Sequence, residues 1–398
     1  MAPSQMAPTR MAPNMIDYAE MVRTFRWQVP ETFNFGADVV DHFARTADGP
    51  ALIWANAAGE ERRFSFSDMA RLTSRFASAL AARGIRKGDR VLVMLPRIPE
   101  WQVAMVGCLK LGAVPIPSIE MLTAKDIAYR VRHARVRAVV ARAEHAGKFA
   151  DVMDEVPVRL ALKGPLGGAP GFEPLEEALA SGDGAFAPVT VKADDPAVLY
   201  YTSGSTGQPK GVLHASRGLY AWRGSAICWL DLRPGDTIWC TADTGWSKAG
   251  TSILFGPWSQ GAAVLFYDGR FDAAERLRLI AHYGVTVFCG AATEFRHLVN
   301  EDLPGVDLGR LLINSTIGIF GLFDVASELG LQRHDEDFGQ TLAVWGWEDS
   351  SFLFWPLVGP RTVRDTALTS DRWRHAHPRC QFSLQLQSDV CHPSWRFG

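Results

Sequence analysis

The chain has 398 residues, 47% of them hydrophobic, and its 41 basic and 43 acidic side chains leave a formal net charge of -2. A chain of this length can bury at least two hydrophobic cores, and a nearly neutral charge balance disfavours binding to nucleic acid. The composition is typical of a large soluble enzyme.

The first residues repeat Met-Ala-Pro three times before Asn14, with no basic segment followed by an apolar stretch. This pattern is typical of a flexible leader and not of a signal peptide, so we expect a leader over residues 1–17 and a cytoplasmic location. The chain has six cysteines, without a CxxC pair or metal-ligand spacing. We expect buried, reduced thiols without a nucleophilic role, and no metal site.

Helix and strand patterns alternate in the first half of the chain. Apolar residues at helical spacing cover 67–83, and a β-rich apolar run follows at 90–95. A second apolar helix is predicted at 99–111 and a short strand at 113–117. This alternation indicates parallel βαβ units. The stretch 164–188, rich in Gly, Ala, Pro and acidic residues, is interpreted as a linker.

The alternation resumes after this linker. The further elements predicted are strands at 198–201, 237–241, 263–267 and 286–289, and a helix at 273–283. Two α/β subdomains, residues 18–190 and 191–310, are the economical interpretation. A loop after the strand at 198–201 would lie at the carboxyl end of a sheet, where ligands of open α/β folds bind.

The stretch that follows this strand has the composition of a phosphate-binding loop. Its members are Thr202, Ser203, Gly204, Ser205, Thr206, Gly207 and Lys210. Glycine N–H groups approach an anion closely, hydroxyl groups donate hydrogen bonds, and Lys210 adds a positive charge. A Ser/Gly-rich surface turn is the alternative.

A Walker A loop is excluded by the position of the lysine. In that loop the lysine follows the last glycine directly and leads into a helix, whereas Gln208 and Pro209 separate Gly207 from Lys210 here. We therefore predict that residues 202–210 form a loop before a strand or turn, with no helix starting at Gly207.

The complete string from Tyr200 to Gly211 resembles the signature of the AMP-forming adenylating enzymes. Three further motifs, in the same order, resemble the medium-chain and aromatic acyl-CoA synthetases: residues 84–91, 111–117 and 243–249. The resemblance covers about residues 18–310. It implies the N-terminal domain of the adenylate-forming ligase fold, which has two α/β subdomains.

The resemblance also implies a two-step reaction. A substrate carboxylate attacks the α-phosphorus of ATP and expels pyrophosphate, and coenzyme A then takes the acyl group from the adenylate. The implied substrates and cofactors are a small carboxylic acid, ATP, Mg²⁺ and coenzyme A. Lys210 and Thr202 are the implied catalytic residues, and the loop binds the ATP phosphates by its N–H groups, hydroxyls and lysine.

The implied acyl pocket is formed by two segments. Thr244, Gly245 and Trp246 line it from one side, and Thr293 and Glu294 begin a helix at the other. Both assignments have alternatives: Trp246 as one of 13 tryptophans in a core, and Glu294 as a solvated pair with Arg296. His214 is interpreted as structural.

The resemblance to the synthetases stops near Arg310. The family continues with an aromatic-Gly-x-Thr-Glu motif, whose glutamate holds Mg²⁺, and with a small C-terminal domain that carries an adenylation lysine. Residues 338–342 read Phe-Gly-Gln-Thr-Leu, so Leu342 stands at the glutamate position. Leucine cannot bind Mg²⁺. We therefore expect a truncated synthetase that makes no acyl-CoA at a useful rate.

The next part of the chain resembles a second family. Residues 310–365 resemble the middle of the VacJ/MlaA lipoproteins, which sit in the outer membrane of Gram-negative bacteria and help return misplaced phospholipids. The run 311–331 is apolar, but Asn314, Asp324 and Glu328 interrupt it, so no spanning helix is expected.

The chain is therefore interpreted as a chimera. Residues 311–368 are assigned to a VacJ/MlaA-like fragment of helices and irregular chain, and residues 369–398 to an unassigned tail. Membrane contact is expected only through 311–365. Acyl-CoA synthesis is the leading function, and phospholipid transport is the alternative.

Overall fold

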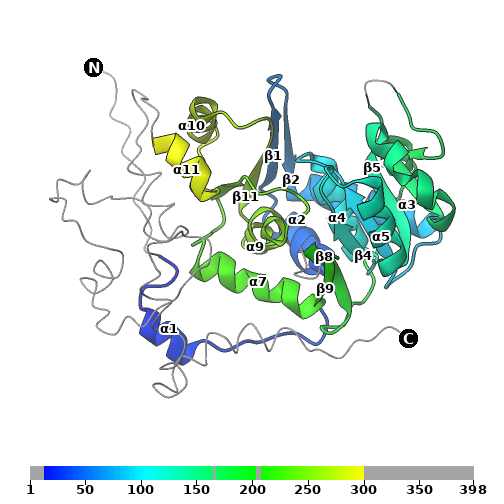
Figure 1. Ribbon diagram of the computed structural model, residues 1–398. Coiled ribbons are helices and arrows are strands. Elements are labelled where there is room, and N and C mark those ends of the chain that lie inside the picture. The colour runs from blue at the N-terminus through cyan, green and yellow to red at the C-terminus, as the bar shows by residue number, and fades with distance from the viewer. Residues whose placement is uncertain (1–12, 165–166, 203–207, 300–398) are drawn as a thin grey trace, which may run out of the picture. The chain divides into compact units, whose positions relative to one another are not determined.

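A computed structural model of the protein describes residues 13–164, 167–202 and 208–299 (Figure 1). The chain divides into two compact units, residues 1–322 and 323–398. All described residues belong to the first unit. The predictions for residues beyond 310 and for loop residues 203–207 therefore lie outside the described residues.

One sheet consists of five parallel strands in the order β4-β3-β5-β6-β7. Its strands are β3 (Arg90–Met94), β4 (Val114–Pro117), β5 (Val136–Arg142), β6 (Val158–Leu162) and β7 (Glu173–Pro174). The first three crossovers are α4 (Pro99–Lys110), α5 (Ala124–Ala134) and the 3-10 segment η2 (Ala143–Glu155). Alternate residues of β3 enter two different cores, since Val91 and Val93 belong to one and Leu92 and Met94 to the other. This burial on both faces is typical of a parallel sheet.

Helix α3 (Phe66–Ala82) begins at a capping box. The Ser65 hydroxyl accepts a hydrogen bond from the Asp68 N–H, and the Asp68 carboxylate accepts one from the Ser65 N–H. The helix packs on α4 at Gly107, where a Cβ atom would lie 2.6 Å from the Phe76 ring. The predicted helices at 67–83 and 99–111 and strands at 90–95 and 113–117 are confirmed within two residues of their bounds.

The other five-stranded sheet has the order β12-β10-β11-β1-β2. Its strands are β1 (Pro50–Asn56), β2 (Glu61–Ser65), β10 (Thr237–Cys240), β11 (Ala263–Asp268) and β12 (Val287–Cys289), and only β2 runs antiparallel to its neighbour. The predicted strands at 237–241, 263–267 and 286–289 are present here. Strands β1 and β2 come from the range 18–190, however, so the sheets do not divide at the expected subdomain boundary.

The range 164–188 is not only a linker. It contains β7 and helix α6 (Leu175–Ser181), whose Leu175 and Ala178 are buried. Helix α6 contacts α3. The composition of this range does not indicate a helix, because glycine, proline and acidic residues surround the two buried apolar residues of α6, which are three positions apart.

The strand before the phosphate-binding loop belongs to a two-stranded antiparallel sheet. Strand β8 (Pro196–Thr202) pairs with β9 (Lys210–Ala215), and β8 contacts β4 of the parallel sheet (Figure 1). Val198 and Tyr200 enter the larger core, while Leu199 and Tyr201 pack against the smaller one. The strand before the loop therefore belongs to an antiparallel hairpin that packs against both cores, and not to an open parallel sheet, whose carboxyl end was the expected position.

The remaining elements surround these three sheets. They are α1 (Tyr18–Thr24), the π-helical η1 (Gly36–Val40), α2 (Asp41–Thr46), α7 (Ser216–Cys228), α8 (Ser247–Ala249), the π-helical η3 (Gly250–Leu254), α9 (Phe255–Ser259), α10 (Ala273–His282) and α11 (Ala292–Val299). The predicted helix at 273–283 corresponds to α10. Before α1, the Asn14 N–H donates to Asp231 at 2.7 Å, so the described end of the expected leader contacts the folded unit. Within the described residues, no helix has the length and apolarity needed to span a membrane.

Candidate functional site

Thr202 and Lys210 flank the predicted phosphate-binding loop. These residues are the last register pair of the β8–β9 hairpin, and both side chains are exposed. Lys210 is the first residue of strand β9 and not part of a helix. Among the described residues, this confirms the prediction of a strand after the loop and speaks against a Walker A arrangement, while residues 203–207 lie outside the description.

Helix α5 holds the base of this loop. The Tyr129 hydroxyl donates to the Pro209 carbonyl at 3.0 Å, and the Tyr129 ring stacks on His133 with centroids 5.3 Å apart. His133 Nδ1 lies 2.7 Å from the Tyr201 hydroxyl. The Arg130 guanidinium stands 5.0 Å from the centre of the Tyr201 ring. Burial raises the pKa of Tyr201 to about 12, so its hydroxyl stays neutral near pH 7.

The sequence analysis missed these α5 residues. A signal was present, because Tyr129 and His133 are four residues apart and share one face of a helix that begins at the capping box of Thr123 and Asp126. That pattern shows which side chains lie together on α5. It does not show that they meet Pro209, which is 80 residues away in the chain.

The first predicted acyl-pocket segment lies between β10 and α8. Thr244 is buried, and its hydroxyl donates to the Leu95 carbonyl at 2.7 Å, just beyond β3. A Cβ atom on Gly245 would lie 2.6 Å from the Ile119 N atom, so a side chain there would clash with the chain beyond β4. Trp246 is 62% exposed, and the alternative of a core tryptophan does not apply to it. The segment therefore crosses the end of the parallel sheet and presents an aromatic side chain outward.

Glu294 of the second predicted segment contacts Thr241, which lies just before the first segment. The Thr241 hydroxyl and the Ala291 N–H both donate to its carboxylate. The buried Arg276 forms an ion pair with Glu294 at 3.2 Å, which differs from the alternative of a solvated pair with Arg296. Thr293 is exposed on the first turn of α11. Glu294 thus anchors the start of α11 to the strand end that leads into Thr244.

A cluster of rings connects the hairpin with the chain that follows Trp246. Tyr200, His214 and Trp222 contact one another, and Trp222 also stacks on Phe255 with ring centroids 5.0 Å apart. A Cβ atom on Gly250 would lie 2.4 Å from the Tyr200 hydroxyl oxygen. Burial lowers the pKa of His214, which suits a neutral side chain packed among rings. Packing therefore joins the hairpin to the chain that follows Trp246, at Gly250 and Phe255.

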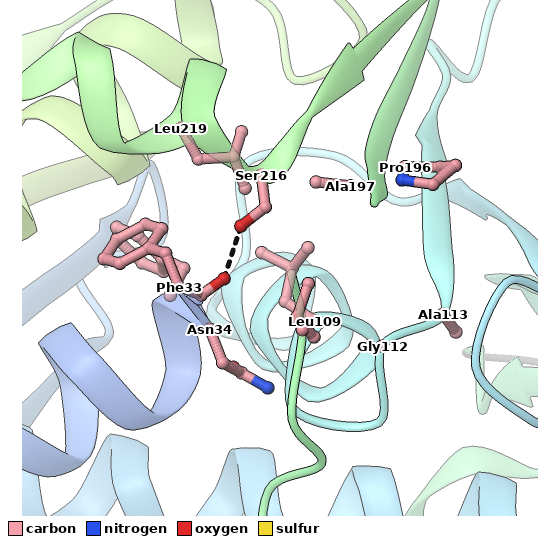
Figure 2. A pocket seen from close by; sticks show the side chains of 11 residues that line it. Phe33, Asn34, Leu109, Gly112, Ala113, Pro196, Ala197, Ser216 and Leu219 are labelled. Carbon is pink, nitrogen blue, oxygen red and sulfur yellow. Dashed lines mark hydrogen bonds between the residues drawn. The ribbon is translucent and has the colours of Figure 1, made fainter. Parts of the chain in front are cut away.

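Two cavities of the described residues are not lined by any predicted site residue. The first, of about 10 Å³, lies where the start of β8 meets Asn34, Leu109 and Ser216, and the Ser216 hydroxyl donates to the Phe33 carbonyl there (Figure 2). It has room for roughly one water molecule. The second, of about 560 Å³, is an open groove between α2, α3 and residues 184–188. Neither is assigned to the candidate site.

The described residues also provide no fitting Mg²⁺ site. Glu120, Glu144 and His145 are the group whose ligand atoms lie close together. The Arg142 guanidinium forms ion pairs with Glu120 at 2.9 Å and with Glu144 at 3.4 Å. Magnesium prefers a nearly ideal octahedron of oxygen ligands, which a guanidinium beside both carboxylates excludes.

Comparisons with known proteins show which family this chain is similar to. The model of the AMP-binding enzyme family matches residues 39–320. Mitochondrial acyl-coenzyme A synthetase ACSM3 of Mus musculus is 36% identical over 313 residues, which are 75% of this chain and 53% of the relative. Mitochondrial acyl-coenzyme A synthetase ACSM4 of Rattus norvegicus is 35% identical, over 76% of this chain and 54% of the relative. This chain spans about half the length of these curated relatives.

A solved structure and a second family extend the comparison. The acyl-CoA synthetase of Brucella canis has a TM-score of 0.64 and 26% sequence identity, covering 72% of this chain and 52% of that one. The model of the MlaA lipoprotein family matches residues 288–389. This second match is longer than the expected fragment 311–368, and nearly all of it lies outside the described residues.

Proposed function

The chain belongs to the AMP-binding enzyme family, and from this we propose that the β8–β9 hairpin binds the phosphates of ATP in an acyl-CoA synthetase. One observation carries the proposal. Lys210 opens β9 directly opposite Thr202, with both side chains exposed at the base of a loop of glycines and hydroxyl residues. The ammonium and hydroxyl groups can then face one bound anion from both sides of the loop base.

The described residues would act mainly by positioning. Lys210 would offset negative charge on the phosphates, and Thr202 would donate a hydrogen bond to them. The hydrogen bond from Tyr129 to Pro209 holds the loop base against α5. We further propose a medium-chain or aromatic carboxylic acid as substrate, with its apolar part against Trp246, and coenzyme A as acyl acceptor. Mg²⁺ would come bound to ATP and reduce the charge of its phosphates.

ATP binding by the full chain tests this proposal. Calorimetric titration with a non-hydrolysable ATP analogue should show binding that Lys210→Ala weakens about tenfold or more, because a charge-assisted hydrogen bond contributes about 1.5–3 kcal/mol. Lys163→Ala is the matched control, since Lys163 is an exposed lysine at the end of the parallel sheet, paired with Glu177. Equal affinities of the two variants would rule out the hairpin as the phosphate site.

The match to the MlaA lipoprotein model supports a second candidate function, phospholipid transport at a membrane. We propose a cytoplasmic location for the chain, with membrane contact confined to residues 311–365. Fractionation of cells that express the full chain separates the two candidates. Recovery with the membranes, lost on deletion of residues 311–365, would favour lipid transport, and recovery in the cytoplasmic fraction would favour the synthetase.

A further inference from the structure

Two cysteines stand side by side at the ends of neighbouring strands. Cys240 ends β10 and Cys289 ends β12, and they are register partners in a parallel pair. The preceding partners, Trp239 and Phe288, are in ring contact at 5.4 Å between centroids. Because side chains alternate between the two faces of a sheet, the cysteines share the opposite face. Paired strands lie about 4.8 Å apart, within the Cα separation of about 4.4–6.8 Å that disulfides span.

The two thiols differ in their surroundings. Cys240 is 1% exposed, whereas Cys289 is only half-buried. A hydrogen bond from Cys240, and then the positive charge of Lys248, hold the pKa of the Cys289 thiol below its usual value. The same hydrogen bond and burial raise the pKa of Cys240. Cys289 is therefore the member of the pair with the greater exposure and the greater thiolate character.

The other described cysteines lack such a neighbour. Cys108 is buried in α4, and burial raises the pKa of its thiol. Cys228 is half-buried at the end of α7, and burial raises its pKa as well. Reactivity of a cysteine follows its thiolate character and its exposure, so Cys289 is the preferred target among the four.

We propose that Cys240 and Cys289 form a hydroperoxide-sensitive modification site that closes to a reversible intrachain disulfide. The Cys289 thiolate attacks one oxygen of hydrogen peroxide, forms Cys289–SOH and releases hydroxide. The Cys240 sulfur then attacks the sulfenic sulfur, its proton leaves with the departing oxygen as water, and the S–S bond forms. Each sulfur loses one electron, and the two peroxide oxygens gain them.

The position of this pair connects it with the acyl segments. The Thr241 N–H donates to the Cys289 carbonyl at 3.0 Å, and the segments that contain Thr244–Trp246 and Glu294 begin directly after the two cysteines. A disulfide would fix the starting points of both segments relative to each other. An effect on acyl binding rests on the proposed function, whereas formation of the disulfide does not.

Peptide mass spectrometry of the full, reduced chain tests the site without any measurement of activity. After hydrogen peroxide treatment, unreacted thiols are blocked under denaturing conditions. We expect a cross-linked pair of peptides that contain Cys240 and Cys289, lighter by two hydrogen atoms, at a peroxide dose that leaves Cys108 and Cys228 unmodified. Dithiothreitol should restore both thiols.

Variants make the assignment specific. In Cys240→Ser, oxidation should stop at a sulfenic acid on Cys289 that dimedone traps, and Cys228→Ser should leave the disulfide unchanged. Lys248→Met keeps both cysteines and should slow the reaction about threefold to tenfold through a smaller thiolate fraction. Overoxidation of Cys289 beside a free Cys240, or a disulfide from either residue to another cysteine, would overturn the proposal. So would a rate no higher than that of Cys228.

Discussion

Tyr129 connects the base of the proposed phosphate-binding loop to helix α5 through a hydrogen bond to the Pro209 carbonyl. We predict that Tyr129→Phe weakens binding of the ATP analogue by up to about tenfold, because a neutral hydrogen bond contributes about 0.5–1.5 kcal/mol. Calorimetric titration measures the change. Tyr283→Phe is the matched control, since its hydroxyl donates to Glu61 away from the hairpin. If the two variants bind the analogue equally well, Tyr129 has no positioning role.

The second prediction at this scale concerns the reactivity of Cys289 as a function of pH. Its lowered pKa means that the thiolate is already present near pH 7 and is lost only as the pH falls through that lowered value. The rate of iodoacetamide modification at Cys289 should therefore reach half its plateau at a pH well below the ordinary thiol pKa of about 8.5. Lys248→Met should move this midpoint upward. A midpoint unchanged by that substitution would show that Lys248 does not stabilise the thiolate.

The sequence suggests some candidate site residues because the pattern that indicates them is local. Thr202 and Lys210 follow from a short run of glycines, hydroxyls and one lysine. Partners distant in the chain were not predictable: Tyr129 meets Pro209, and Arg276 rather than Arg296 pairs with Glu294. A charged residue two positions along a helix lies on a different face, which is why Arg296 is a poor partner for Glu294.

At the scale of elements, the start of α3 offers a stability test. The hydrogen bond from the Ser65 N–H to the Asp68 carboxylate lowers the pKa of Asp68 in the folded chain. The contribution of Asp68 to stability is therefore full above its unfolded pKa and is lost as the pH falls through the folded value. Ser65→Ala should cost about 1 kcal/mol, seen as a lower urea midpoint, and Asp68→Asn should remove part of the loss of stability between pH 5 and about 3. An Asp68→Asn chain with unchanged acid sensitivity would contradict this.

The buried Lys110 joins α4 to α2 and α3. Its ammonium donates to Asp41 at 2.5 Å and to the Ala70 carbonyl and Ser74 hydroxyl at 2.9 Å, so all three of its hydrogens are used. Burial raises the pKa of Asp41, and the ammonium opposes that rise. Removing one member of such a pair leaves an uncompensated buried charge.

We predict that Lys110→Met lowers the free energy of unfolding by about 3–5 kcal/mol, measured by urea denaturation. Lys87→Met is the control, because Lys87 is 42% exposed and its ion pair with Asp195 should contribute about 1 kcal/mol or less. Adding Asp41→Asn to Lys110→Met should recover part of the loss. A loss for Lys110→Met no larger than that for Lys87→Met would show that this buried pair is not stabilising α4.

The helices and strands that the sequence predicted correctly are those whose own apolar pattern is enough to identify them. Helix α4 and strands β3, β4 and β11 are continuous buried runs. Strand β1 is buried from Ala51 to Ala55, yet it was not predicted, and its pairing with β11 crosses more than two hundred residues. Helix α6 was missed inside a stretch whose composition is typical of loops. The local apolar pattern indicates where a strand lies in the sequence, but pairing with distant strands decides which sheet it joins.

At the scale of the whole molecule, the two family matches divide the chain unequally. The AMP-binding enzyme model matches residues 39–320 and the MlaA lipoprotein model residues 288–389, so they overlap near β12 and α11. The described residues up to 299 contain both acyl segments and the base of the loop. The motif in which Leu342 replaces the expected glutamate lies outside them. ATP binding and turnover can therefore be tested as separate properties of one chain.

We predict that the full chain binds ATP but does not release pyrophosphate at a useful rate. Leucine has no oxygen with which to hold Mg²⁺, and loss of one positioned metal or cationic contact in this chemistry costs on the order of a thousandfold in rate. Pyrophosphate release is measured with ATP, Mg²⁺ and a panel of medium-chain and aromatic acids, with Lys210→Ala as the blank. The wild-type chain should release no more pyrophosphate than that blank, although we expect it to bind the ATP analogue more tightly in the calorimetric titration. Carboxylate-dependent release that Lys210→Ala abolishes would mean that another residue supplies the missing ligand and that the chain is a working synthetase.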